Sequence, residues 1–329
     1  MKKIIPLILL VISIILTGCG KYGQKDVEKD LNKKVNKLSS YKLDGNLEIV
    51  NNEDVYTYFV EVSYKKDDYY KVSLTNKSNN YEQIILKNTD GVYVVTPSLN
   101  KSFKFQSDWP YNNSQIYLLQ TLLKDIKNDE EKLVEQVDGG YKITTSVNYS
   151  NNHNLVKQHI YVDDKANITK VEIVDSNDIV KMKMNFEKID LSATYKNDYF
   201  DLNANMKNAE TATTSKEIED VIYPMHVPAN TYLKSQDTIN LDDGERIILT
   251  FAGESPFTII EQTVTVTDDY EMTTVYGDPE LLVDTIGSVT TNSVSFISNG
   301  IEYYAVSEVL DQNQLLEVAK SISVLPVGK

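Results

Sequence analysis

Apolar and polar side chains alternate along the stretch Tyr41-Lys42-Leu43-Asp44-Gly45-Asn46-Leu47-Glu48-Ile49. This period of two is typical of a strand that buries one face and exposes the other, as in antiparallel sheets. The same alternation returns at residues 56–64 and 69–74. We predict further strands at residues 82–87, 92–96, 102–106, 142–148, 156–162, 169–174 and 180–186. Residues 41–191 are therefore expected to form a long antiparallel meander.

Two helical patterns accompany this meander. At residues 26–38 four apolar residues recur at helical spacing, with Asp and Lys on the other side: Val27, Leu31, Val35 and Leu38. The stripe is narrow and lacks aromatic residues, which favours packing against the domain over lying on a membrane surface. A second helix is predicted at residues 114–127, and its broad apolar face must be covered by a sheet.

These patterns predict an α+β protein. Residues 26–201 are expected to form a curved, incompletely closed antiparallel β-barrel with a helical lid. Residues 202–216 are rich in Asn, Ala and Thr without apolar period, which predicts a linker. Residues 217–329 are expected to form a smaller C-terminal α+β module.

The C-terminal module begins with an extended segment, Tyr223-Pro224-Met225-His226-Val227-Pro228, because each proline biases the residue before it away from helix. Strands are predicted at residues 231–235, 246–251, 258–266, 272–276, 293–298 and 301–306. Asn299-Gly300 is the strongest hairpin signal in the chain. Asp311 is placed to cap a last helix at residues 312–321.

The N-terminus carries an export signal. Lys2 and Lys3 precede an almost unbroken apolar run at residues 4–16, which is shorter than the roughly 20 residues that cross a bilayer. Leu16-Thr17-Gly18-Cys19 follows, and it resembles the lipobox of bacterial lipoproteins. The resemblance implies that residues 1–18 are a signal peptide and that Cys19 is lipidated, with acyl chains such as palmitate. Residues 19–25 would then be a spacer, and the protein would be anchored to the cell membrane on its extracytoplasmic face.

The layout of the whole chain also resembles a known family. An N-terminal helix is followed by Ser-Tyr-Lys-Leu-Asp-Gly at residues 40–45, then by Trp109-Pro110 before a helix, and then by more strands. This layout resembles the lipoprotein-carrier fold of outer-membrane lipoprotein carriers, mycobacterial lipid-transport lipoproteins and a sigma-factor regulatory protein. Together with the lipobox and the C-terminal module, it resembles the sporulation and germination lipoproteins of spore-forming Gram-positive bacteria.

Charge and composition exclude several functions. The net charge is −15, and removal of residues 1–18 with their two lysines lowers it to −17. Nucleic acid is therefore not an expected partner, because its phosphates would repel the protein. Cys19 is the single cysteine, so its lipidation leaves no thiol for a disulfide, a zinc site or a nucleophile.

No catalytic or metal-binding pattern is present in the sequence. The three histidines, His153, His159 and His226, do not lie at helical ligand spacing, and we interpret His153 as solvated and His159 as a polar-face residue. The Asp pairs at 67–68, 163–164, 242–243 and 268–269 lack the calcium-loop pattern, and they fall where hairpin turns are needed. We therefore expect no cofactor, no metal and no enzymatic activity.

Aromatic residues give one further candidate site. Trp109 is the single tryptophan, and it is either a plug that seals the second helix against the sheet or a residue at an interface or cavity mouth. The 22 tyrosines are expected mainly to pack in the sheet, and Tyr69 and Tyr70 must point to opposite faces. The alternative is that part of this aromatic face receives an acyl chain.

Two functions remain open. The first is a non-enzymatic scaffold or activator for a cell-wall enzyme of the spore cortex, such as a peptidoglycan hydrolase, as the resemblance to germination lipoproteins implies. The alternative is a lipid or lipoprotein carrier or sensor that binds an acyl chain in the half-barrel cavity. An anchored protein cannot leave its membrane as a shuttle, which favours the scaffold.

Overall fold

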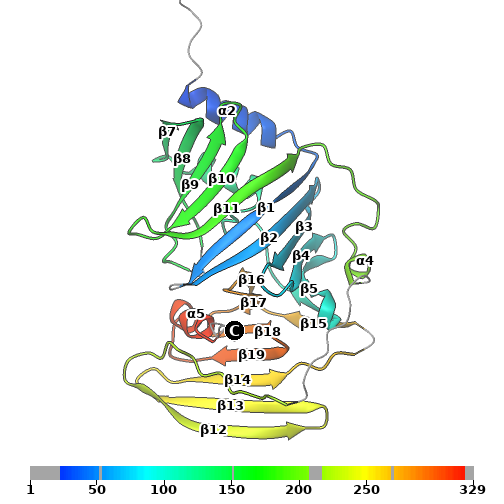
Figure 1. Ribbon diagram of the computed structural model, residues 1–329, viewed down its shortest axis with the longest axis vertical. Coiled ribbons are helices and arrows are strands. Elements are labelled where there is room, and N and C mark those ends of the chain that lie inside the picture. The colour runs from blue at the N-terminus through cyan, green and yellow to red at the C-terminus, as the bar shows by residue number, and fades with distance from the viewer. Residues whose placement is uncertain (1–22, 52–53, 150–151, 207–216, 268–269, 323–329) are drawn as a thin grey trace, which may run out of the picture.

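The computed structural model describes residues 23–51, 54–149, 152–206, 217–267 and 270–322 (Figure 1). A twelve-stranded sheet makes up the larger part, in the order β15-β6-β5-β4-β3-β2-β1-β11-β10-β9-β8-β7. Eleven of these strands lie before residue 191: β1 (Ser40–Asn51), β2 (Asp54–Lys65), β3 (Tyr69–Asn76), β4 (Glu82–Asn88), β5 (Gly91–Thr96), β6 (Lys101–Phe105), β7 (Leu133–Val137), β8 (Gly140–Ser146), β9 (Lys157–Asp163), β10 (Ile168–Val174) and β11 (Val180–Asp190). The sheet stays open, because its edge strands do not pair with each other, and its mostly β character agrees with the sequence prediction.

One face of this sheet forms the main core. Along β1 the residues Tyr41, Leu43 and Leu47 are fully buried, while Lys42, Asp44 and Asn46 are partly exposed, as the alternation predicts. The helices α2 (Gln24–Val35) and α3 (Leu119–Asn128) pack into the same core through residues such as Leu31 and Leu122. Burial of Val27 and Leu31 confirms that the first helix packs against its own domain.

The opposite face carries a smaller core over β3 to β5. Ile84, Leu86 and Tyr93 pack there against Phe200 and against the short helix α4 (Leu202–Met206). Tyr69 stacks against Phe200 in this core, whereas Tyr70 lies in the main core. The prediction that these two tyrosines point to opposite faces is confirmed.

The C-terminal part builds a seven-stranded sheet, in the order β12-β13-β14-β19-β18-β17-β16. Its elements are β12 (Thr231–Leu241), β13 (Gly244–Gly253), β14 (Phe257–Thr263), β16 (Asp278–Leu281), β17 (Ile286–Val289), β18 (Ser293–Ser298), β19 (Ile301–Val306) and the helix α5 (Gln312–Lys320). Asn299 and Gly300 both have positive φ at the β18–β19 turn, and Asp311 caps α5 by accepting a hydrogen bond from the Gln314 N–H at 2.9 Å. Both predictions are confirmed.

The two sheets are joined by pairing and by buried hydrogen bonds. β15 (Glu271–Val275) leaves the C-terminal part and pairs in parallel with β6 at the edge of the large sheet. The buried Gln83 side chain accepts hydrogen bonds from Thr285 Oγ1 at 3.0 Å and from the Ile286 N–H at 2.7 Å. The Tyr58 hydroxyl donates to the Val283 carbonyl at 2.9 Å. These contacts fix the C-terminal sheet against one end of the large sheet.

Two sequence predictions need correction, and three strands were not predicted. The helix predicted at 114–127 begins only at Leu119. The Ser114 N–H donates to the carbonyl of Asn148, just after β8, at 2.7 Å, and this bond holds Ser114 outside the helix. The predicted linker begins with α4, whose Met206 is buried, while residues 207–216 lie outside the described residues. β7, β16 and β17 were not predicted. No helix among the described residues is long and apolar enough to span a membrane.

Candidate functional site

Trp109 lies inside the main core. Its side chain is 1% exposed, and its ring meets Tyr70 edge-on with the centroids 5.8 Å apart. The Lys87 ammonium donates to the Trp109 carbonyl at 2.8 Å, and the Trp109 N–H donates to Ser107 Oγ at 3.0 Å. This burial favours the plug interpretation over an interface role.

The face that a carrier would need for a ligand is largely filled. The segment before α3 brings Trp109, Ile116 and Leu118 into the main core, and α3 adds Leu122 and Ile126. Side chains of the chain itself therefore pack over this face of the sheet.

A cavity of about 360 Å³ remains beneath α2, and we call it the α2 pocket. It is bounded by α2, the start of α3, the turn between β9 and β10, and the end of β11. Most of its lining is apolar: Leu31, Val35, Leu119, Ala166, Ile168, Phe186, Ile189 and Leu191. At its rim the Lys34 ammonium donates to Asn167 Oδ1 at 2.7 Å. The volume lies near the lower end of the roughly 300–1,000 Å³ of small-molecule sites.

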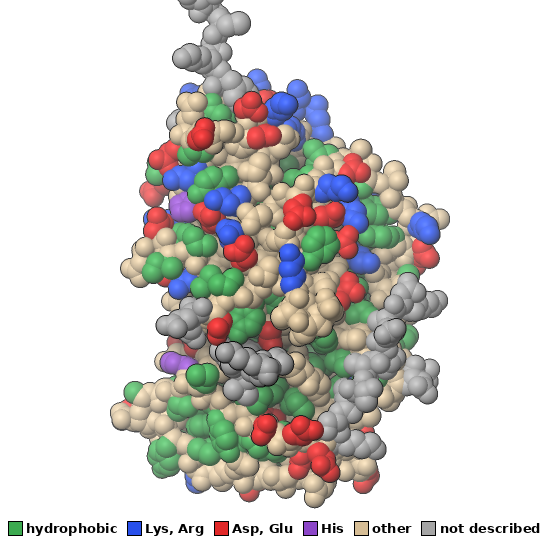
Figure 2. All heavy atoms as spheres, viewed as in Figure 1, with side chains coloured by type: hydrophobic (Ala, Val, Ile, Leu, Met, Phe, Trp, Pro, Cys, Tyr) green, Lys and Arg blue, Asp and Glu red, His purple; other side chains and the backbone are tan. Residues whose placement is uncertain are grey.

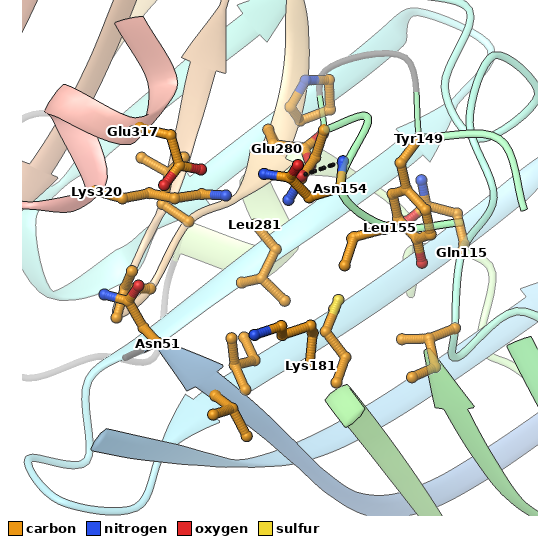
Figure 3. A pocket seen from close by; sticks show the side chains of 18 of the residues that line it. Asn51, Gln115, Tyr149, Asn154, Leu155, Lys181, Glu280, Leu281, Glu317 and Lys320 are labelled. Carbon is orange, nitrogen blue, oxygen red and sulfur yellow. Dashed lines mark hydrogen bonds between the residues drawn. The ribbon is translucent and has the colours of Figure 1, made fainter. Parts of the chain in front are cut away.

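A second cavity, of about 180 Å³, lies where the large sheet meets α5 and β16 (Figure 3). We call it the junction pocket. Figure 3 shows Lys181 of β11 and Asn51 of β1 on one side, and Glu317 and Lys320 of α5 on the other. Burial lowers the pKa of Lys320.

The described lining of the junction pocket lacks the residue types of one common catalytic arrangement. Among the described residues that line it there is no Ser, Thr, Cys or His, so a nucleophile paired with a histidine base is not formed there. Its volume is also below the usual range of small-molecule sites. The Lys and Glu side chains in it come from segments far apart in the chain, and the sequence pattern did not indicate them.

His153, His159 and the Asp pairs at 67–68, 163–164 and 242–243 occupy the places that the sequence predicted, whereas residues 268–269 lie outside the described residues. His153 is exposed, and the His159 ring lies on a strand with Nδ1 3.0 Å from Thr144 Oγ1. Asp67 and Asp68 both have positive φ in the turn between β2 and β3. Within the described ranges no group of three or more His, Cys, Asp or Glu side chains is placed to hold a metal ion. Cys19 lies outside the described residues.

One buried acid was not predicted. Glu261 of β14 is 0% exposed, and its two carboxylate oxygens accept from the Ile222 N–H at 3.1 and 3.3 Å. Burial raises the pKa of the Glu261 carboxyl to about 7. The group holds the extended segment that enters the C-terminal sheet. The period of two along β14 places Glu261 on the same face as Phe257 and Ile259, and this is the signal that could have found it.

Comparison with known proteins gives one relative along the whole length. The chain is 34% identical over 314 residues to the sporulation protein YdcC of Bacillus subtilis (strain 168), covering 94% of this chain and 93% of the relative. No family model matches the chain.

Solved structures show weaker likeness. The Pseudomonas aeruginosa MucA/MucB complex contains a chain matched at 12% identity over 90% of this chain and 97% of that one, with a TM-score of 0.33. A chain in the structure of the CwlD amidase from Clostridioides difficile in complex with the GerS lipoprotein matches at 20% identity over 54% of this chain and 98% of that one, with a TM-score of 0.24.

Proposed function

The chain belongs to the family of the Bacillus subtilis sporulation protein YdcC, and from this premise we propose that it acts in spore formation or germination. The role is that of a membrane-anchored extracytoplasmic lipoprotein, which binds and supports a cell-wall enzyme of the spore cortex without catalysing a reaction itself. The observation that carries the proposal is the 34% identity across 94% of the chain to a sporulation protein. Such coverage extends over both sheets.

The packing of the main core supports a scaffold. A carrier needs an empty, apolar interior, whereas Trp109, Leu118 and Leu122 are buried in the core that covers this face of the sheet. A scaffold works through its outer surface, and a filled interior makes that surface rigid.

The experiment is a peptidoglycan assay with purified components. The body from residue 20 onward is incubated with isolated cortex peptidoglycan, alone and together with a cortex amidase from the same organism. We expect no product from the body alone, and a higher rate from the amidase when the body is present. Product release by the body alone, or an amidase rate that does not respond to it, would contradict the proposal.

The α2 pocket supports the alternative, a carrier or sensor that binds an acyl chain. Its 360 Å³ are lined mainly by apolar side chains under a helix that directly follows the proposed lipid anchor. The test is native mass spectrometry of the body after incubation with palmitate, using Val35→Trp to fill the pocket. Binding by the wild type and none by Val35→Trp would favour the carrier. Absence of binding by both would exclude it.

A further inference from the structure

β12 leaves one side of its backbone unpaired. It is the terminal strand of the seven-stranded sheet and pairs with β13 alone, so along its other side no strand of the described residues is bound. At 11 residues it is about twice as long as an average strand. A long, uncovered edge offers a row of N–H and C=O groups to another chain, and proteins normally shorten, cover or interrupt it.

Most side chains of β12 are also exposed, although the Tyr223 hydroxyl donates to Gln236 Oε1 at 2.5 Å. Eight of its residues are exposed and three are half-buried, although the neighbouring β13 buries Ile247, Leu249 and Phe251. Tyr232 is 62% exposed and Leu233 is 39% exposed, and as neighbours in a strand they point to opposite faces. Apolar side chains therefore border the unpaired edge above and below.

A bulge and an exposed lysine protect the start of β12, whereas Asp237 is the charged residue in its later part. The register with β13 shifts between Leu233 and Ser235, so that Lys234 lies in a bulge. From Ser235 to Leu241 the pairing is unbroken and the strand contains no proline. These seven residues are the part that can accept a further strand.

Charge determines what kind of strand fits. Residues 217–329 contain 19 acidic and four basic residues, a net charge of −15, whereas residues 1–216 contain 29 of each and are neutral. In Figure 2 the Lys and Arg side chains gather over the large sheet, while the charged side chains over the lower strands are mainly acidic. Asp237 lies on β12 itself, and the exposed Asp242 and Asp243 form the turn that follows it.

We propose that β12 accepts a basic, extended segment of a partner protein as an eighth strand of this sheet. The partner's backbone pairs along residues 235–241, its apolar side chains cover Ile239, and its Lys and Arg side chains meet Asp237, Asp242 and Asp243. Addition of a strand to a sheet edge takes its affinity from the main chain and its selectivity from the alternate side chains. A second copy of this chain does not fit, because it brings the same net charge of −15 to the contact. The proposal is independent of the role in sporulation.

The probe is a fluorescein-labelled peptide of about ten residues that alternates Lys and Val, long enough to pair along the edge. Two control peptides separate pairing from charge. The first has the same charge but carries two prolines in its centre, so that it cannot form a strand. The second replaces Lys by Glu. We expect fluorescence anisotropy to show binding of the Lys-Val peptide at least about ten-fold tighter than that of either control.

The variants Asp237→Pro and Thr238→Pro test the edge directly. Successive N–H groups of a strand point to opposite sides, so one of these prolines removes a bond to β13 and the other removes only an outward donor. The outward variant is identified by its unchanged melting temperature, and Asp237→Ala controls for the lost carboxylate.

We expect the outward proline variant to bind the Lys-Val peptide about ten-fold more weakly than the wild type or Asp237→Ala. Equal binding by the outward variant would overturn the proposal, as would equal binding of the proline-containing peptide. Sedimentation equilibrium gives a third test. If the wild-type protein dimerises and the outward proline variant does not, the proposal is overturned, because a second copy would then occupy the edge.

Discussion

Trp109→Ala tests whether the single tryptophan is a structural plug. The ring is 1% exposed, and burial of an aromatic side chain removes about 150–250 Å² from water. At about 25 cal/mol per Å² this corresponds to roughly 4–6 kcal/mol, and truncations of buried Trp or Phe cost about 3–5 kcal/mol. We therefore expect the free energy of unfolding to fall by about 4 kcal/mol and the melting temperature by on the order of 10 °C.

The assay is denaturant unfolding followed by circular dichroism, with two matched controls. Trp109→Phe keeps a ring against Tyr70 and removes an indole N–H that makes no hydrogen bond among the described residues, so it should cost much less than the alanine variant. Tyr276→Ala removes a ring that is 69% exposed and should change stability little. A melting temperature of Trp109→Ala equal to that of the wild type, with weaker binding to a partner enzyme, would refute the plug and favour an interface anchor.

Three further predictions concern the anchor, the connection of the sheets and a buried acid. Cys19→Ala should leave the protein unprocessed or released, and unchanged detergent partitioning and size would contradict lipidation. After cleavage at a protease site engineered within residues 207–216, the two pieces should stay together on native size-exclusion chromatography. They are joined by the pairing of β15 with β6 and by the hydrogen bond between Gln83 and the Ile286 N–H. Two separate peaks would contradict this. The pKa of the Glu261 carboxyl is about 7 in the folded protein, against an ordinary value of 4.5. Between these two pH values the folded state therefore binds more protons than the unfolded state. The free energy of unfolding should fall as pH rises from about 4.5 to 7, by at most on the order of 3 kcal/mol. In Glu261→Gln this part of the slope should vanish in melting temperatures measured from pH 4.5 to 8, and an unchanged slope would exclude Glu261 as its source.

Local patterns predicted the strands well. The alternation at residues 41–49 identified β1, and the Asn299-Gly300 signal placed the turn between β18 and β19. Both depend on neighbours in sequence, because pleating and turn conformation are local properties. The start of α3 was wrong for the same reason: its apolar pattern extends back to Ile116, but the hydrogen bond of Ser114 to Asn148 competes from 34 residues away.

Long-range contacts could not be predicted in this way. The alternation at residues 272–276 indicated a strand, and β15 does form there, but nothing in it showed that the partner is β6 in the other sheet. The junction pocket likewise joins Lys181 with Glu317 and Lys320, which are far apart in sequence. The unpaired state of β12 also became visible only once the sheet order was known.

The parallel pairing of β15 with β6 has a consequence for the order of folding. Glu271 lies opposite Lys101, and the Tyr58 hydroxyl bonds to Val283, so these contacts close loops of 170 and 225 residues. Contacts of such sequence separation form slowly, because the entropy of a long loop is lost before the contact is gained. As the chain is synthesised or exported from its N-terminus, β6 stays an exposed edge until the last fifth of the chain arrives. A chaperone that covers strand edges would therefore be needed most in that interval, and truncation before residue 271 should yield a protein prone to aggregation at β6.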